Sequence, residues 1–275
     1  MDQTIAVLKQ LLAASPSKDN VLRRNILKEY FQVLVLDFIY SHKEYSQLFF
    51  YGGSCLAHCY GLPRLSEDLD FVDVKMNIHL EAFSKDVQEY VKKETGIALK
   101  AVCQKFRVYL KFPILHTLGL ATASESDLLF LKVEIFRDPG FCMSFKTEYI
   151  PVFKLNRSII VRTFDLPTLM STKIRAVLLR KWEKKDTSGN VVATVKGRDY
   201  FDLMWYLEKS VTPNLECIPE ANGLEDLKSK LLAVISRVDT KSIRVDLEAL
   251  IDNRQFVETI SANMKSIIEK GIQKL

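Results

Sequence analysis

Asp68 and Asp70 are separated by a single leucine within the apolar stretch DLDFV. From Glu67 to Val74 the pattern alternates with period two, which predicts a strand whose two aspartates project from the same face. Two carboxylates on one side repel each other, and a divalent cation relieves that repulsion. Mg²⁺, which binds oxygen ligands and substrate phosphates, suits such a pair. Taken alone, the pair is more often a solvated strand edge than a metal site.

A glycine-rich turn, Gly52-Gly53-Ser54, precedes the aspartates and opens a stretch of small residues, 54–61, that suits a helix. Taken alone, a Gly-Gly pair at a strand end is usually a simple turn, because glycine adopts positive φ freely. Backbone N–H groups at such a turn also allow a close approach of phosphate oxygens. A phosphate-binding turn beside two carboxylates indicates phosphoryl or nucleotidyl transfer.

The elements that must position these residues follow from hydrophobic periodicity and from Gly and Pro breaks. Early helices are expected at 2–14, 19–41, 54–61 and 78–94. Strands are expected at 48–51, 67–74, 104–112, 129–137 and 158–164. The pattern then becomes helical, with helices expected at 166–184, 198–209, 224–238 and 246–274. The fold class is therefore α+β, a mixed sheet with flanking helices in residues 1–164 followed by a helical domain in residues 165–275.

The composition is that of an ordinary soluble globular protein, with 48% hydrophobic and 27% charged residues and a formal net charge of +5 over 275 residues. The longest apolar runs are too short to span a bilayer, and no secretion signal follows Met1, so no membrane partner is expected. The five cysteines are odd in number and lack paired CxxC spacing. They favour reduced thiols in a cytoplasmic protein, without disulfides.

The combined motif GGSCLAHCYGLPRLSEDLDF resembles the signature of the polymerase-β-type nucleotidyltransferase superfamily. More narrowly, it resembles the AbiEii/AbiGii toxin family, which includes the MenT toxins. YFQVLVLDFIY before the motif and KVEIF, STKIRAVLLR and GRDYFDL after it follow in the family's order, over roughly residues 24–207. The resemblance implies a palm-like nucleotidyltransferase domain with N-terminal helices (1–164) and a helical domain (165–275) that carries Lys173 and Asp199.

The resemblance also implies a metal site. Asp68 and Asp70 would bind Mg²⁺, or Mn²⁺ in its place, and would be catalytic. The superfamily places a third carboxylate on a neighbouring strand, and Glu134 is the candidate here. Glu134 shares its strand face with Lys132, so an edge residue without a metal is the alternative.

For the nucleotide, the resemblance implies that Gly52, Gly53 and Ser54 bind the phosphates. Arg64, just before the DLD strand, matches the family pattern as well. Its guanidinium would either contact phosphate or pair with Glu67.

In the helical domain, the resemblance gives Lys173 a catalytic role as a point charge on the triphosphate. By itself, a lysine on a helix is usually solvated. Asp199 would be the family's final motif aspartate, and it would orient the basic residue or the acceptor. Arg180 would either assist in binding the nucleotide or only favour the C-terminal end of its helix, and Asp202 would cap the helix or form a salt bridge.

The family implies a toxin of a toxin–antitoxin or phage-defence system that transfers a nucleotide from an NTP to RNA. The 3′ end of tRNA, reached across the cleft between the domains, is the expected acceptor, and a cognate antitoxin is an expected partner. A basic segment would contact the RNA backbone, and it contains Arg180, Lys181, Lys184, Lys185, Lys196 and Arg198. The alternatives are a small-molecule or protein hydroxyl as acceptor, a nucleotide-binding module without turnover, and a basic segment that is only a solvated helix end.

Overall fold

The computed structural model describes residues 1–137, 142, 144–186 and 188–275. The chain forms two compact units. The first unit contains Met1–Phe141 and Thr147–Thr163, and the second contains Cys142–Lys146 and Phe164–Leu275. Among the described residues, no helix combines the length and the apolar character that crossing a bilayer requires.

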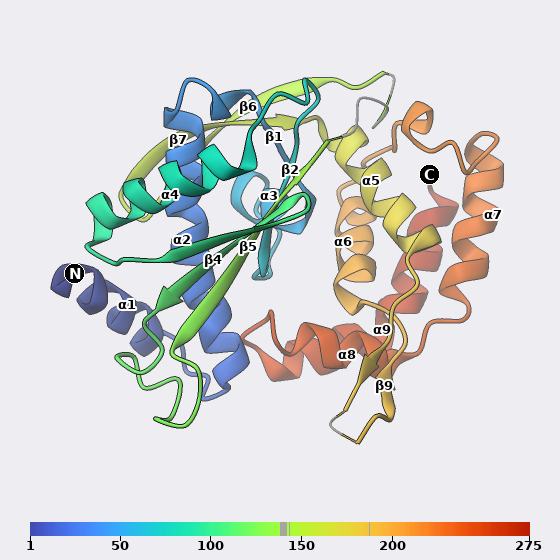
Figure 1. Ribbon diagram of the computed structural model, residues 1–275. Helices are drawn as coiled ribbons and strands as arrows, with labels where there is room; N and C mark the ends of the chain where they lie inside the picture. The colour runs from blue at the N-terminus through green and yellow to red at the C-terminus, as the bar shows by residue number, and fades with distance from the viewer. Residues whose placement is uncertain (138–141, 143, 187) are drawn as a thin grey trace. The chain divides into compact units, whose positions relative to one another are not determined.

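The first unit is built on a mixed sheet. Among the described residues, seven strands run in the order β3-β4-β5-β2-β1-β7-β6 (Figure 1). Strand β1 is antiparallel to β2 and parallel to β7, while β2 is parallel to β5. The strand bounds are β1 Phe49–Tyr51, β2 Asp68–Val72, β3 Lys100–Gln104, β4 Arg107–Pro113, β5 Leu128–Phe136, β6 Thr147–Lys154 and β7 Arg157–Phe164.

Helices pack on one face of this sheet. Helix α2 (Asn20–Ser41) contacts both α4 (Leu80–Thr95) and β5, and α1 (Asp2–Ala14) packs on α2 (Figure 1). The ring of Phe31 in α2 stacks on Phe112 of β4, with ring centroids 3.9 Å apart. Every second residue of β2, β4 and β5 is buried, so the alternation predicted for these strands is confirmed. The other face of β2 and β5 carries Asp68, Asp70, Lys132 and Glu134, together with the exposed rings of Phe130 and Phe136.

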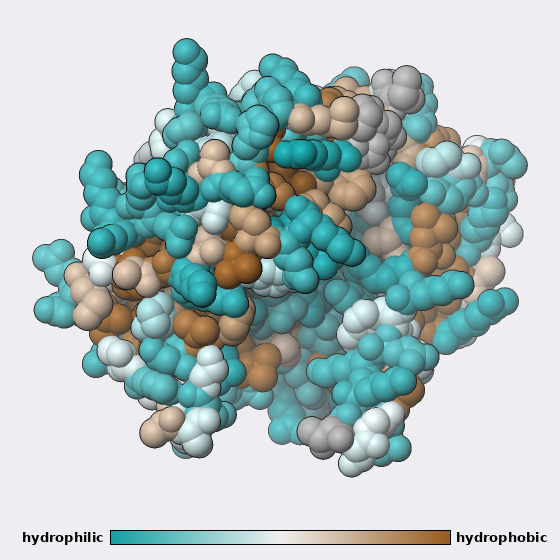
Figure 2. Space-filling model, viewed as in Figure 1, coloured by the Kyte–Doolittle hydropathy of each residue, from teal (hydrophilic) through white to brown (hydrophobic). Residues whose placement is uncertain are grey.

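The second unit is mostly helical. Its helices are α5 Leu166–Leu179, α6 Gly197–Glu208, α7 Leu224–Ile235, α8 Thr240–Leu247 and α9 Arg254–Gln273. Helices α8 and α9 both pack on α6. A short hairpin pairs β8 (Lys184–Lys185) with β9 (Val191–Ala193). Figure 2 shows mainly hydrophilic side chains over this hairpin.

Three sequence expectations about elements were wrong. The helix expected at 166–184 ends at Leu179, where the backbone of Arg180 turns extended (ψ 120°). The helix expected at 246–274 is two helices, because α8 ends at Leu247 and Asn253 caps a new helix by accepting from the N–H of Phe256. Strands β3 and β6 were not predicted at all.

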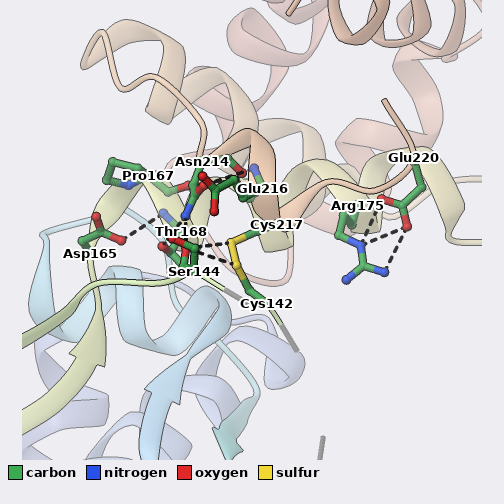
Figure 3. The surroundings of a disulfide bond; sticks show 11 residues. Cys142, Ser144, Asp165, Pro167, Thr168, Arg175, Asn214, Glu216, Cys217 and Glu220 are labelled. Atoms are coloured by element: carbon green, nitrogen blue, oxygen red, sulfur yellow. Dashed lines mark hydrogen bonds and ion pairs between the residues drawn. A yellow bond between two sulfur atoms is a disulfide. The ribbon is translucent and has the colours of Figure 1, made fainter. Parts of the chain in front are cut away.

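A disulfide between Cys142 and Cys217 corrects the expectation that all five cysteines are reduced (Figure 3). The two residues lie 75 positions apart, and their Cα atoms are 4.8 Å apart. Asn214, three residues before Cys217, donates from Nδ2 to the carbonyl oxygen of Ser144 (2.6 Å), so the two segments are already held together. Local spacing gives no sign of this pair, because it forms only when segment 142–146 folds onto the second unit. Cys55, Cys59 and Cys103 are free thiols.

Candidate functional site

Asp68 and Asp70 lie on β2, on the polar face of the sheet. The register pairs Asp68 with Lys132 and Asp70 with Glu134, both on β5, and pairs Tyr51 of β1 with Asp70. Directly paired residues of neighbouring strands point to the same face of a sheet. These five side chains therefore share one face, as the period-two pattern predicts for Asp68 and Asp70. We call Asp68, Asp70, Lys132, Glu134 and their neighbour Arg107 the polar row.

Helix α3 (Gly52–Cys59) begins directly after β1, and Asp70 lies against its first residue. Gly52 has a φ of +79°, and a Cβ at this position would lie 2.5 Å from Oδ2 of Asp70. Glycine thus serves two purposes here, since it adopts the left-handed backbone and leaves space for a carboxylate. The first N–H groups of a helix attract anions. Because Asp70 contacts Gly52, its carboxylate lies beside this helix start.

Arg64 brings a positive charge to the same helix start. A Cβ on Gly53 would lie 2.3 Å from Nη2 of Arg64, so the guanidinium lies directly against this glycine. Only 6% of Arg64 is exposed, and its Nη1 donates to the carbonyl oxygen of Leu65 (2.8 Å). A buried guanidinium beside a helix N-terminus makes this region attractive to anions such as phosphates.

Ser54 has a structural contact in addition to its predicted role. Its side chain is fully buried, and its hydroxyl contacts the hydroxyl of Ser66 (2.9 Å) and the backbone carbonyl of Asp68. These contacts tie α3 to the start of β2. Phosphate binding by the Ser54 hydroxyl stays a prediction.

Buried polar contacts from α2 fix α3 and the loop that follows it. Gln32 donates from Nε2 to the carbonyl oxygen of Ser66 (2.8 Å), and its Oε1 lies 3.0 Å from Nε2 of His58. Burial, with a smaller effect from Lys154, lowers the pKa of His58 from 6.5 to about 3. His58 is therefore neutral at physiological pH and links α3 to α2 through its hydrogen bond with Gln32.

Glu134 is held by two cations. Its Oε1 lies 2.9 Å from Nζ of Lys132 and 2.6 Å from Nε of Arg107. Lys132 also reaches Oδ2 of Asp68, at 2.9 Å. Although burial opposes the charged form of Lys132, Asp68 and Glu134 outweigh it and raise the pKa of the ammonium group. The role of Glu134 as a metal ligand stays a prediction.

The donor chemistry of Asp68 and Asp70 fits Mg²⁺. Within the described part of the chain, no three or more His, Cys, Asp or Glu side chains converge to hold a metal ion. Magnesium does not require such a cage, because one or two carboxylates together with substrate phosphates and water complete its octahedron. The space that Gly52 leaves for the Asp70 carboxylate keeps a hard oxygen ligand beside the anion-attracting helix start.

In the second unit, Lys173 is not a solvated lysine. Its ammonium group lies 2.9 Å from Oδ1 of Asp199 and 2.8 Å from Oδ2 of Asp202, and only 11% of its side chain is exposed. Arg180 contacts the other oxygen of Asp199. The two carboxylates are almost completely buried. We call Lys173, Arg180, Asp199 and Asp202 the buried ion cluster.

The charges of the buried ion cluster balance, with two cations and two carboxylates. Burial opposes the ionised form of Asp199, but Lys173 and Arg180 outweigh it and lower the pKa of this carboxyl. Asp199 contacts both basic side chains, and its role in orienting the basic residue or the acceptor for the reaction stays a prediction. Asp202 forms a salt bridge, one of its two predicted roles.

Three of the six basic residues in the basic segment contact partner side chains, and the other three are exposed lysines. Arg198 is held by Asp246, with Nη2 2.8 Å from Oδ1, and Arg180 belongs to the buried ion cluster. Lys196 is half-buried, with Nζ 5.9 Å from the centre of the Trp182 ring. The remaining three lysines are exposed, and they are Lys181, Lys184 and Lys185. They lie beyond the end of α5 and on β8, so the helix expected to carry them ends before them. Both interpretations of the segment, an RNA contact and a surface that is only solvated, stay predictions.

Sequence reasoning missed the contacts of Arg107 and the role of Asp246. Arg107 stands first in β4 and pairs with Glu134 across the strands. Its position in the alternating strand is visible in the sequence, but its partner depends on the register. Asp246, which binds the backbone N–H and the guanidinium of Arg198, gives no local signal.

Comparison with known proteins identifies the family of the chain. The family model described as "Nucleotidyl transferase AbiEii toxin, Type IV TA system" matches residues 37–273. No curated protein matches the chain. Two crystal structures from Helicobacter pylori are similar over most of their length. One is provisionally assigned as a nucleotidyltransferase (TM-score 0.48, 19% identity, 90% of this chain and 96% of that chain covered). The other is JHP933 (TM-score 0.47, 18% identity, 91% of this chain and 94% of that chain covered). Since the family match covers most of its length, the chain is a nucleotidyltransferase that belongs to the AbiEii toxin family.

Proposed function

We propose that this protein is the toxin of a toxin–antitoxin pair that serves in phage defence and transfers a nucleotide from an NTP to RNA, with the 3′ end of tRNA as acceptor. The observation that carries the proposal is the position of Asp70, on the same strand face as Asp68 and directly against the first residue of α3. This arrangement puts hard oxygen ligands beside a helix start that attracts phosphates.

The residues of the first unit have separate tasks. Asp68 and Asp70 would hold Mg²⁺, which supplies charge neutralisation for the triphosphate when it is bound. The first N–H groups of α3 and the guanidinium of Arg64 would hold phosphate oxygens and orient the triphosphate. The acceptor hydroxyl oxygen then forms a bond to the α-phosphorus while the bond to pyrophosphate breaks, and the hydroxyl proton passes to solvent. Catalysis of this kind relies on positioning and electrostatics.

In the second unit, the exposed lysines support an RNA acceptor. Lys181, Lys184 and Lys185 present exposed positive charge, and among the described residues their shortest ion pair is 4.0 Å, between Lys185 and Glu183. Such charges bind a phosphate backbone without reading its sequence. Selection of tRNA would then depend on its folded shape and its single-stranded end.

The test of the chemistry is a transfer assay with Mg²⁺, total tRNA and each of the four α-labelled NTPs in turn. The wild-type protein should label RNA with one or a few of the nucleotides. Asp70→Asn should reduce labelling at least about hundredfold, because it removes a metal ligand, while Asp127→Asn, outside the polar row, should leave it unchanged. Labelling of a small molecule or a protein in place of RNA would refute the acceptor, and normal labelling by folded Asp70→Asn would refute the metal site.

The test of the RNA contact is a charge reversal with a matched control. The triple variant replaces Lys181, Lys184 and Lys185 by Glu, and the control replaces three exposed lysines of the first unit, Lys92, Lys93 and Lys100. Each lost contact to single-stranded RNA should reduce the slope of log affinity against log salt by about 0.7. The slope should therefore fall by about 2 in the triple variant and stay unchanged in the control. Equal slopes in both variants would show that these lysines do not bind RNA.

A further inference from the structure

Lys132 lies within the polar row itself, between two of its three carboxylates. Its Nζ is 2.9 Å from Oδ2 of Asp68 and 2.9 Å from Oε1 of Glu134. Since Lys132 and Asp68 are directly paired across β5 and β2, the backbone register places the two side chains next to each other on one face of the sheet. Three-quarters of the lysine side chain is buried, with 25% exposed, which distinguishes this contact from a solvated surface pair.

Arg107 is the second cation that contacts the carboxylate of Glu134. Its Nε lies 2.6 Å from the same Oε1 that lies 2.9 Å from Nζ of Lys132. One oxygen of Glu134 therefore already faces two cations. A divalent ion at this oxygen would stand next to both of them, and their repulsion would oppose its binding.

The charges around the polar row lead to the same result. Its three carboxylates face the two cations of the row, and the guanidinium of Arg64 lies against Gly53, next to the glycine that Asp70 contacts. One divalent cation therefore already leaves an excess of positive charge, which the phosphates of a nucleotide offset. A second divalent cation would add two more positive charges in a half-buried region, at a high cost in electrostatic free energy.

We propose that the ammonium group of Lys132 takes the place of a second divalent cation, so that the polar row binds a single Mg²⁺ ion, at Asp68 and Asp70. The inference rests on the proposed function, because it concerns the metal site of the same reaction. Glu134 then serves to hold Lys132 in position and is not a metal ligand. The protein is thus a one-metal nucleotidyltransferase with a built-in monovalent cation.

The experiment is a titration with Mn²⁺ alone, in which free Mn²⁺ is measured by electron paramagnetic resonance and no nucleotide is present. The wild-type protein should bind one Mn²⁺. Lys132→Met removes the ammonium group, so it should bind a second Mn²⁺ or bind the first at least about tenfold more tightly. The control is Lys111→Met, since Lys111 lies on the same face of β4 with its ammonium group over the ring of Phe130. It should bind Mn²⁺ as the wild type does.

Lys132→Gln, with a shorter neutral side chain, repeats the measurement if Lys132→Met does not fold, as judged by near-ultraviolet circular dichroism. Unchanged or weaker Mn²⁺ binding in the folded Lys132 variant would overturn the inference. Two Mn²⁺ ions on the wild-type protein would also overturn it and would leave the proposed function intact. No Mn²⁺ on the wild-type protein would refute the metal site of the proposed function, and the inference with it.

Discussion

Replacing Lys173 by methionine tests whether the buried ion cluster holds the second unit together. In the structure the Lys173 ammonium group lies within 2.9 Å of Asp199 and Asp202, whose side chains are 4% and 0% exposed. Removing one partner of a buried ion pair typically costs about 3–5 kcal/mol, because the remaining charge stays buried. Asp199 keeps Arg180, so the lower end of this range applies, and we expect a loss of about 3 kcal/mol.

Urea unfolding, followed by tryptophan fluorescence, is a suitable assay. The chain has two tryptophans, and both Trp182 and Trp205 belong to the second unit, so their emission reports on that unit. With a slope of about 1–3 kcal/mol per molar urea, the midpoint should fall by about 1–3 M. The double variant Lys173→Met/Asp202→Leu should recover part of the loss, since it removes the uncompensated charge as well.

Arg175→Met is the matched control, because Arg175 is in the same helix and pairs with Glu220 at 3.0 Å. That pair is much more exposed, at 36% and 20%, so its loss should cost at most about 1 kcal/mol. A midpoint for Lys173→Met no lower than that of Arg175→Met would refute the reasoning. The ion pairs of Lys173 with Asp199 and Asp202 would then contribute little to the stability of the second unit.

Three further predictions concern the helix start, the pH dependence and the disulfide. Gly52→Ala should lower the free energy of unfolding by about 1–2 kcal/mol, because alanine is strained at the positive φ of this position. The same change should reduce nucleotide transfer, because the new Cβ displaces Asp70. The control Gly61→Ala, at a φ of +73° and with no atom within 4 Å of the new Cβ, should leave transfer unchanged. The folded pKa of His58, about 3, is below its ordinary value of 6.5, so the unfolded chain takes up the proton first, and unfolding free energy measured in urea should fall below about pH 6.5 by up to about 1.4 kcal/mol per pH unit. His58→Gln should remove this slope, and exposed His79→Gln should retain it. Cys217→Ser should lower the free energy of unfolding by about 4 kcal/mol under oxidising conditions, as the closed loop of 75 residues implies. Equal urea midpoints for the wild type and Cys217→Ser would show that the disulfide does not form.

The central strands could be predicted from the sequence, and the edge strands could not. Strands β2, β4 and β5 bury every second residue, so apolar and polar residues alternate visibly in their sequences. Strands β3 and β6 lie at the two edges of the sheet and have only weak burial patterns. Strand β6 also contains Pro151, which is tolerated because an edge strand needs fewer ladder hydrogen bonds.

In the candidate site, the shared faces could be predicted but the partners could not. Period two placed Asp68 with Asp70, and Lys132 with Glu134, on common strand faces. The contacts of Lys132 with Asp68 and of Arg107 with Glu134 depend on which strands are neighbours and in what register, and a single strand does not contain that information. For the same reason, the burial of Lys173 between two carboxylates appears only once α5 and α6 are packed.

The parallel pairing of β1 with β7 has a consequence for synthesis on the ribosome. Strand β1 obtains this neighbour only from residues 157–164, more than a hundred positions after Tyr51. At about 5–20 residues per second, the ribosome needs on the order of ten seconds to make the intervening chain. During this time the apolar strand FFY has an open edge, and open apolar edges pair with other chains. We therefore expect truncated chains that end before Arg157 to aggregate more readily than the full chain.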